Sequence, residues 1–370
     1  MKDNFEVYFN KELEFLSFLQ DMESEAKWLR TPTNSLRAVT AKNIDAAARY
    51  ATLPELEIYQ DTVENTGLYV KFGKEEFPVG NTAMPTYYAR CRISGSALRE
   101  ISKDDLRTIL NKCIQVGKGT ALVYVAGEKV RAIHAGDEND YAILPMGEVF
   151  QTAGRVLRKD FSEVDFINGF YDHMLSVGRW SVFSEGIADA YDLLFPQNVS
   201  NDRARCVISV STSNTGFSGA NIHYSLMDGV ATVFCGRAIK LEHKNHASIS
   251  DFKGNMELIL AKFKESIADL EGLKKIIIRN PDECMYNIMV KAGIGKKLAA
   301  ETVEKRQVLT NPGKSNAFDL YLDICQCVDI AVAEGMDNGR LIEDLEEKVS
   351  SCIFMKWSEF DTPKISRRTA

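Results

Sequence analysis

The chain has 370 residues, of which 45% are hydrophobic and 26% are charged, and its formal net charge at pH 7 is −7. These proportions exclude a wholly disordered chain and fit two modules or one large α+β body. An acidic molecule has no overall basic field to attract nucleic acid or an anionic membrane, so any phosphate-binding surface must be local.

The sequence predicts a soluble, cytoplasmic protein without a membrane partner. No stretch approaches the roughly 20 uninterrupted apolar residues that cross a bilayer. Acidic residues near the start argue against a signal peptide. The eight cysteines are scattered and form no CxxC pair, so we expect buried, reduced thiols with neither disulfides nor a zinc site.

The first 62 residues are expected to form an N-terminal helical segment. An amphipathic helix is predicted within the first 30 residues, with Phe9, Leu13, Leu16 and Leu19 on one face and acids opposite. The next 26 residues suggest a capped helix that ends before Pro54.

Residues 63–250 are expected to form an α+β core. Two hairpins are predicted, one over 66–81 with Gly73 at its turn and one over 120–136 with its turn at Gly127. Ser102 is a natural N-cap for the helix that follows it, and another helix is expected after Pro145. Residues 163–242 are rich in strand-forming residues, and breaks are expected at the following glycines: Gly178, Gly219 and Gly229.

Beyond residue 250 the hydrophobic period changes to 3.6, which predicts four or five helices over 251–360 and a flexible tail over 361–370. Hairpins followed by helices, without βαβ alternation, indicate an α+β fold with a largely antiparallel sheet.

The most specific local motif is the sequence Gly293-Ile294-Gly295, which lies between two helical patterns and is followed by Lys296 and Lys297. It resembles the helix-hairpin-helix of DNA-associated proteins. Two glycines let such a turn approach a phosphate, and the free N–H groups of the second helix face the anion. The alternative is an ordinary turn between two helices with a glycine C-cap.

Basic residues near the strand ends of the β-rich region offer a second candidate for phosphate contact. Hydroxyls, backbone amides and cations together can follow a nucleic-acid backbone. The alternative is a polar loop whose residues satisfy their own backbone. The candidate residues are Arg203, Arg205, Arg237, Lys240 and Lys244.

His243 and His246 are weak candidates for a metal site, with a third ligand from Glu242, Asp251 or His223. We favour a loop that caps the next helix and therefore expect no metal. Gly313-Lys314-Ser315 lacks the first glycine of a phosphate loop, because Val308 stands at that position. No other nucleotide-binding or hydrolase motif is present, so we expect neither a cofactor nor catalytic activity.

Separated blocks at 129–150, 207–227, 238–252 and 316–331 resemble, in order, a family of phage- and plasmid-borne proteins with a domain of unknown function. In the first block the shared residues are Arg131, Ala132, Tyr141 and Pro145, although "AGDEND" replaces the serine and arginine that commonly flank the tyrosine. The resemblance implies a mobile-element protein acting in a bacterial cell, with no agreed activity to transfer.

Three functions follow from these patterns. The first is a non-catalytic nucleic-acid-associated protein that contacts the DNA backbone in replication, recombination or genome protection. The second is an interaction or counter-defence protein that binds a host or phage protein through its acidic surface and N-terminal helix. The third is a metal-dependent nucleic-acid enzyme that uses His243 and His246. The sequence is also compatible with a homo-oligomer.

Overall fold

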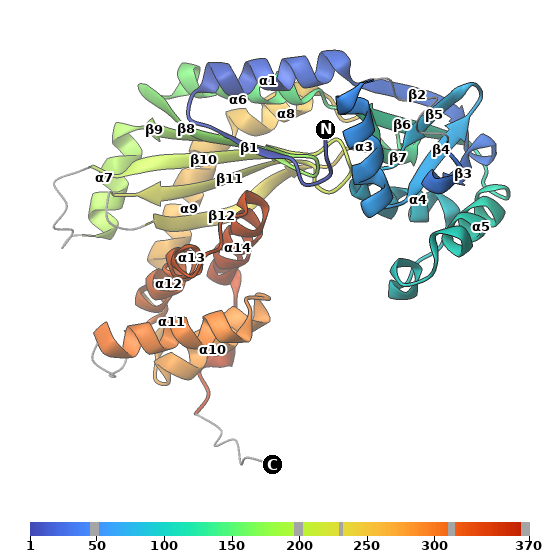
Figure 1. The fold of residues 1–370 in the computed structure, drawn as a ribbon. Helices are drawn as coiled ribbons and strands as arrows, with labels where there is room; N and C mark the ends of the chain where they lie inside the picture. Colours follow the sequence, from blue (N-terminus) through green and yellow to red (C-terminus); the bar gives the residue numbers. More distant parts are fainter. Residues whose placement is uncertain (45–51, 196–202, 229–231, 310–314, 364–370) are drawn as a thin grey trace, which may run out of the picture.

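The computed structural model describes residues 1–44, 52–195, 203–228, 232–309 and 315–363. Its centre is a six-stranded antiparallel sheet in the order β1-β8-β9-β10-β11-β12 (Figure 1). The strands of this sheet are β1 (Glu6–Phe9), β8 (Glu163–Asp172), β9 (Ser176–Phe183), β10 (Arg205–Thr212), β11 (Ala220–Met227) and β12 (Thr232–Leu241).

One face of the large sheet carries the main hydrophobic core. Phe15 of α1 and Phe150 of α6 lie 4.9 Å apart, measured between ring centroids, above the buried Trp180. A Cβ at Gly178 would come within about 3 Å of all three rings, so glycine lets these helices pack closely onto β9. The helices on this side are α1 (Glu12–Glu25), α6 (Met146–Asp160), α8 (Ile249–Glu257) and α9 (Ile259–Leu273).

A smaller α+β part has its own hydrophobic core. Its two three-stranded sheets, in the orders β2-β6-β7 and β3-β4-β5, meet at a parallel bridge between Val79 and Val130. The elements are β2 (Lys27–Pro32), β3 (Arg37–Thr40), α3 (Leu53–Glu64), β4 (Leu68–Phe72), β5 (Glu75–Pro78), α4 (Met84–Cys91), α5 (Lys103–Ile114), β6 (Thr120–Ala126) and β7 (Lys129–Ala135).

The C-terminal helices lie below the large sheet in Figure 1, and α14 packs against β12. A short ladder joins β13 (Ile277–Ile278) to β14 (Ser315–Asn316). The helices are α10 (Pro281–Lys291), α11 (Lys296–Leu309), α12 (Ala317–Cys325), α13 (Cys327–Ala333), α14 (Gly339–Ser351) and α15 (Trp357–Phe360); α7 (Glu185–Leu194) follows β9.

The α+β class and the large antiparallel sheet are confirmed. Both predicted hairpins are present, and Gly73 and Gly127 have positive φ angles at their turns. Ser102 caps α5 by accepting a hydrogen bond from the Asp105 amide. Seven cysteines are buried, while Cys113 is half-buried, and all eight are free thiols.

The N-terminal helical segment is corrected. Residues 1–62 contain β1, β2 and β3, each of which pairs with a strand beyond that segment. The end of the helix predicted before Pro54 falls on 45–51, outside the described residues, and α3 begins at Leu53. In α1 the buried residues are Phe15, Leu19 and Met22, whereas Leu13 is 81% exposed. The alternation of polar and apolar residues in β1 also fits the start of an amphipathic helix, so the sequence pattern predicted a helix there.

Two further expectations change. Gly178 lies within β9, and the strand break falls between Asp172 and Ser176. The described residues from α8 onward hold eight helices instead of the four or five expected, because single residues separate α8 from α9 and α12 from α13, and because the four-residue α15 follows α14. Some predicted features lie outside the described residues: the break at Gly229, the residues Gly313 and Lys314, and positions 364–370 of the tail.

The N-terminal residues are fixed by a buried charge network between the two parts of the molecule. The Lys129 ammonium contacts Asp3 at 3.2 Å and also pairs with Asp61. The Arg131 guanidinium donates to Asp3 Oδ1 at 2.7 Å and to the Met1 carbonyl at 2.7 Å. Lys129 and Arg131 are at most 1% exposed, so each cation depends on its carboxylate partners.

We expect Lys129→Met to lower the free energy of unfolding by about 3–5 kcal/mol, because it leaves two buried carboxylates with one cation. Urea denaturation measures the change. Lys74→Met, at the exposed turn of the β4–β5 hairpin, is the matched control and is expected to stay within about 0.5 kcal/mol of the parent. Equal effects of the two variants would show that the network adds nothing to stability.

Candidate functional site

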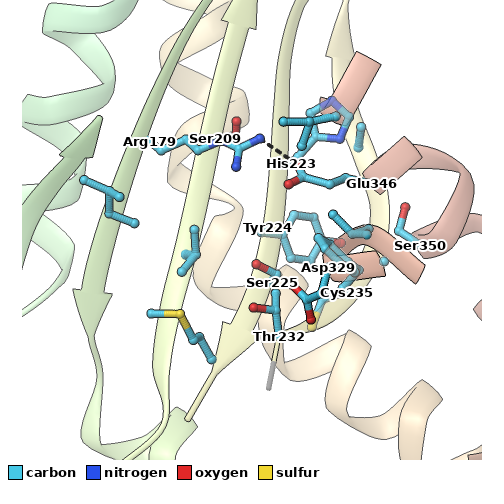
Figure 2. Close-up of a pocket in the computed structure, with 18 of the residues that line it drawn as sticks. Arg179, Ser209, His223, Tyr224, Ser225, Thr232, Cys235, Asp329, Glu346 and Ser350 are labelled. Atoms are coloured by element: carbon cyan, nitrogen blue, oxygen red, sulfur yellow. Dashed lines mark hydrogen bonds and ion pairs between the residues drawn. The ribbon is translucent and has the colours of Figure 1, made fainter. Parts of the chain in front are cut away.

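A pocket of about 310 Å³ lies between the second face of the large sheet and helices α13 and α14 (Figure 2). Strands β8 to β12 form its floor. Both polar and apolar side chains line the pocket. Its apolar lining includes Val207, Met227, Phe234, Val328, Val332 and Ile342.

A row of polar side chains crosses this floor, with one residue from each of four neighbouring strands. Strand register pairs Asn168 with Arg179, Arg179 with Ser209, and Ser209 with His223. Paired residues of antiparallel strands point to the same face, and all four line the pocket. The Ser209 hydroxyl is buried and has no hydrogen-bond partner among the described residues. It is therefore a donor that faces the pocket unpaired.

Helix α14 covers the same sheet face through three glutamates spaced i, i+3 and i+4. Figure 2 shows Glu346 and Arg179 pointing toward each other, and Glu346 Oε2 lies 2.9 Å from Arg179 Nη2. Glu343 Oε1 is 3.6 Å from His223 Nε2, and Glu347 pairs with Lys240. The helix thus meets β9, β11 and β12 through charged groups, not through an apolar seam.

Burial controls the protonation of these groups. It raises the pKa of Glu343 to about 7, and it raises the pKa of Glu346 against the opposing effect of Arg179. Burial lowers the pKa of His223 to about 4. At neutral pH His223 is therefore uncharged, and Glu343 is close to its midpoint of titration.

The glycine turn joins α10 to α11, as the helix-hairpin-helix resemblance predicted. However, the Gly293 amide donates to the Val290 carbonyl and the Ile294 amide to Met289. This pair of bonds is the Schellman arrangement that ends a helix, with Gly293 at a φ of +87°. The amides of Gly293 and Ile294 are thus occupied in ending α10, whereas Gly293, Gly295 and Lys296 are exposed.

Most of the predicted basic residues already pair with carboxylates. Arg205 bridges Glu163 at 2.8 Å and Asp165 at 2.7 Å. Lys297 lies between Glu301 and Glu334, at 3.3 and 3.4 Å. The other partnerships are Arg203 with Asp189 and Asp192, Lys240 with Glu347, Lys244 with Glu242, and Arg237 over the Phe354 ring at 4.9 Å.

These residues are also spread over three places. Arg203 and Arg205 lie at the start of β10, whereas Lys240 and Lys244 lie at the end of β12, which register places at the opposite end of the sheet. The turn that holds Gly293 is separate again and lies beside Lys348 of α14. The structure therefore does not join the nine candidates into one surface.

The histidines do not converge. His243 is buried, with Nδ1 3.0 Å from the Ala142 carbonyl, and it stacks on Tyr141. His246 is exposed, and its Nδ1 lies 3.4 Å from a Glu138 carboxylate oxygen. Among the residues that the structure describes, no group of three or more His, Cys, Asp or Glu side chains is arranged to hold a metal ion.

The sequence reading missed the pocket, although two signals were present. Ser209 and Ser211 alternate with Ile208 and Val210, which is the pattern of a strand with one polar face. Residues 341–349, "LIEDLEEKV", place three glutamates on one face of a helix and two leucines on the opposite face. Neither pattern predicts that the polar face of β10 and the glutamate face of α14 lie against each other.

Comparison with known protein families, with curated proteins and with solved structures found no match. The resemblance to phage- and plasmid-borne proteins therefore stays a prediction. Within the described ranges, none of the helices has the length and apolar character needed to cross a membrane.

His134 belongs to the same ring stack as His243. Its centroid lies 3.6 Å from that of Tyr141, and its Nε2 lies 2.9 Å from the Asn214 carbonyl, where it donates if the ring is neutral. Burial lowers the pKa of His134 to about 4. Because the unfolded chain binds this proton more readily, His134 makes the folded state lose stability as pH falls from about 6.5 toward 4.

We expect His134→Gln to reduce this loss, so that the free energy of unfolding changes less between pH 6.5 and 4 than in the parent. Urea denaturation across that range measures the slope. Tyr141→Phe is the control, because it removes the hydrogen bond to the Asn214 carbonyl without removing a group that titrates there. It should lower stability by about 1 kcal/mol at every pH and give a parallel profile. A His134→Gln profile parallel to the parent would contradict the assignment.

Proposed function

We propose that this protein binds a small molecule with an apolar body and a hydrogen-bonding head group in the pocket beneath α13 and α14. The observation that carries the proposal is the buried, unpaired Ser209 hydroxyl, which stands in a row with Arg179 and His223 on the pocket floor. Unsatisfied buried donors are rare in folded proteins, because each costs about 1–3 kcal/mol when it loses water.

The pocket suits such a molecule in size and chemistry. Its volume of about 310 Å³ is at the lower end of the range typical of ligand sites. Apolar side chains from the strands and from α13 provide walls for the body of the ligand. The head group would accept a hydrogen bond from Ser209, beside the Arg179–Glu346 pair that fixes the guanidinium. Asp329, which is exposed, lies on the pocket lining.

Filling the pocket tests the proposal. Saturation-transfer NMR with four- to eight-carbon carboxylates and amides should give ligand signals with the parent protein and none with Ser209→Leu. Ser162→Leu, on the exposed surface, is the control and should retain the signals. Ser209→Ala should weaken binding about 3- to 10-fold while leaving stability equal or higher, because its hydroxyl has no partner to lose. Unchanged signals with Ser209→Leu would refute the site.

Nucleic-acid contact is a second candidate function, confined to the turn between α10 and α11. Lys291 and Lys296 flank the exposed glycines, and no ion pair occupies either lysine among the described residues. The first amides of α11 have no acceptor within the helix, as at any helix N-terminus, and such amides attract phosphate. This observation supports the backbone contact expected from the resemblance to the helix-hairpin-helix motif.

We expect Lys291→Glu/Lys296→Glu to abolish a weak, salt-sensitive binding to duplex or single-stranded DNA, measured by fluorescence anisotropy from about 50 to 200 mM salt. Lys305→Glu, an exposed charge reversal on α11, is the single-site control and should weaken binding less. If the parent shows no binding at about 50 mM salt, this function is wrong and the small-molecule proposal is unaffected.

A further inference from the structure

A second cavity, of about 550 Å³, lies on the other side of His223. It is bounded by the start of β11, the end of β12 and the first turns of α14. His223 lines both this cavity and the pocket of Figure 2, so the imidazole stands between them. The residues that matter for its chemistry are Phe217, His223, Lys240, Arg340, Glu343 and Glu347.

Carboxylates outnumber cations around this cavity, but most of them are paired. Glu242 lies 3.0 Å from Lys244, Asp344 pairs with Lys348, and Glu347 pairs with Lys240. Arg340 lies 3.9 Å from Asp172 of β8. Each of these acids therefore has a cation, and none needs a ligand.

Glu343 differs from the others. It is 7% exposed, and its nearest ion-pair partner is His223 at 3.6 Å, which burial keeps uncharged at neutral pH. Neither Oε1 of Glu343 nor the Ser211 hydroxyl has a hydrogen bond of ordinary length within the described ranges, although Ser211 and Arg179 lie close enough to oppose the rise in the pKa of Glu343. A buried carboxyl in this position needs either a proton or a cation from outside the chain.

We propose that the second cavity binds a small organic cation with a primary ammonium group, which donates a hydrogen bond to Glu343 and takes the place of its proton. The ring of Phe217 forms part of the wall and is 51% exposed. It already accommodates a cation, since the Arg340 guanidinium lies 5.6 Å from its centroid. The alkyl part of the ligand lies toward this ring.

The surrounding charges allow an ammonium group to take the place of the proton on Glu343. From the sheet, Arg179 of β9 and Lys240 of β12 repel a cation, but Glu346 and Glu347 of α14 neutralise them. Arg340 and Asp344 complete the charged groups on α14 that face the cavity. Because burial raises the pKa of Glu343 to about 7, the ammonium competes with a proton below that pH. Affinity should therefore fall as the pH drops from 8 to 6.

Isothermal titration calorimetry of the full chain with butylamine and 1,4-diaminobutane tests the proposal, with 1-butanol as the uncharged probe. At pH 8 the amines should bind at least tenfold more tightly than 1-butanol, and Glu343→Gln should lower amine affinity at least tenfold. Glu242→Gln removes an exposed carboxylate from the rim of the same cavity. As the matched control, it should change affinity less than twofold.

Three results would overturn the proposal: no heat from the amines with the parent, equal binding of 1-butanol, or equal effects of Glu343→Gln and Glu242→Gln. Thermal melting should show that Glu343→Gln is folded, since it removes a buried carboxyl without changing its shape. Glu343→Asp, which withdraws the carboxylate from the cavity but keeps the charge, should also weaken binding. Ser209→Leu should leave amine binding intact, so failure of the small-molecule pocket and failure of this site are distinguishable.

Discussion

The contact between α14 and the large sheet is the constraint on which the functional part of the molecule depends. A helix usually covers a sheet through an apolar stripe, but here Glu343, Glu346 and Glu347 meet His223, Arg179 and Lys240 on three different strands. Leu345 and Val349 are also buried, but helical spacing places them on the opposite side of α14, where Leu345 lies beside Ile294 and Ala331. A polar interface packs less completely than an apolar one, because each charged group also needs hydrogen-bonding partners. Both cavities lie along this contact.

This arrangement also explains why the basic residues make a poor nucleic-acid surface. An acidic chain with net charge −7 has more carboxylates than cations, and the fold places carboxylates beside most of the exposed arginines and lysines at the sheet ends. A phosphate would have to displace those carboxylates before it could contact the cations. The gain would be small, because exposed ion pairs are screened by salt whether the partner is a carboxylate or a phosphate. Lys291 and Lys296 avoid that competition because they stand at a turn between helices, away from the sheet ends.

Local patterns were sufficient for much of the fold. Gly73 and Gly127 marked their hairpins because a tight turn needs positive φ, and Ser102 marked the start of α5 because its side chain can cap the amide three residues on. Residues 6–9 were not recognised as a strand, because β1 is stabilised by pairing with β8, more than 150 residues away. The strand propensity of four residues carries no information on a distant partner strand. A hydrophobic alternation of that length next to a helix also fits the period of the helix.

The site lies beyond sequence reasoning for the same reason. Arg179, Ser209 and His223 lie on three different strands and become neighbours through strand register. A shift of the register by one residue would turn the side chains of the shifted strand to the other face of the sheet. Glu343 reaches them from a helix more than 100 residues later. The glycine turn, in contrast, could be predicted from the sequence because its residues are adjacent along the chain. The motif alone, however, did not establish that the turn binds phosphate. The Schellman bonds show why: the glycine that makes such a turn recognisable is needed to end the first helix, whether or not an anion binds at the start of the second.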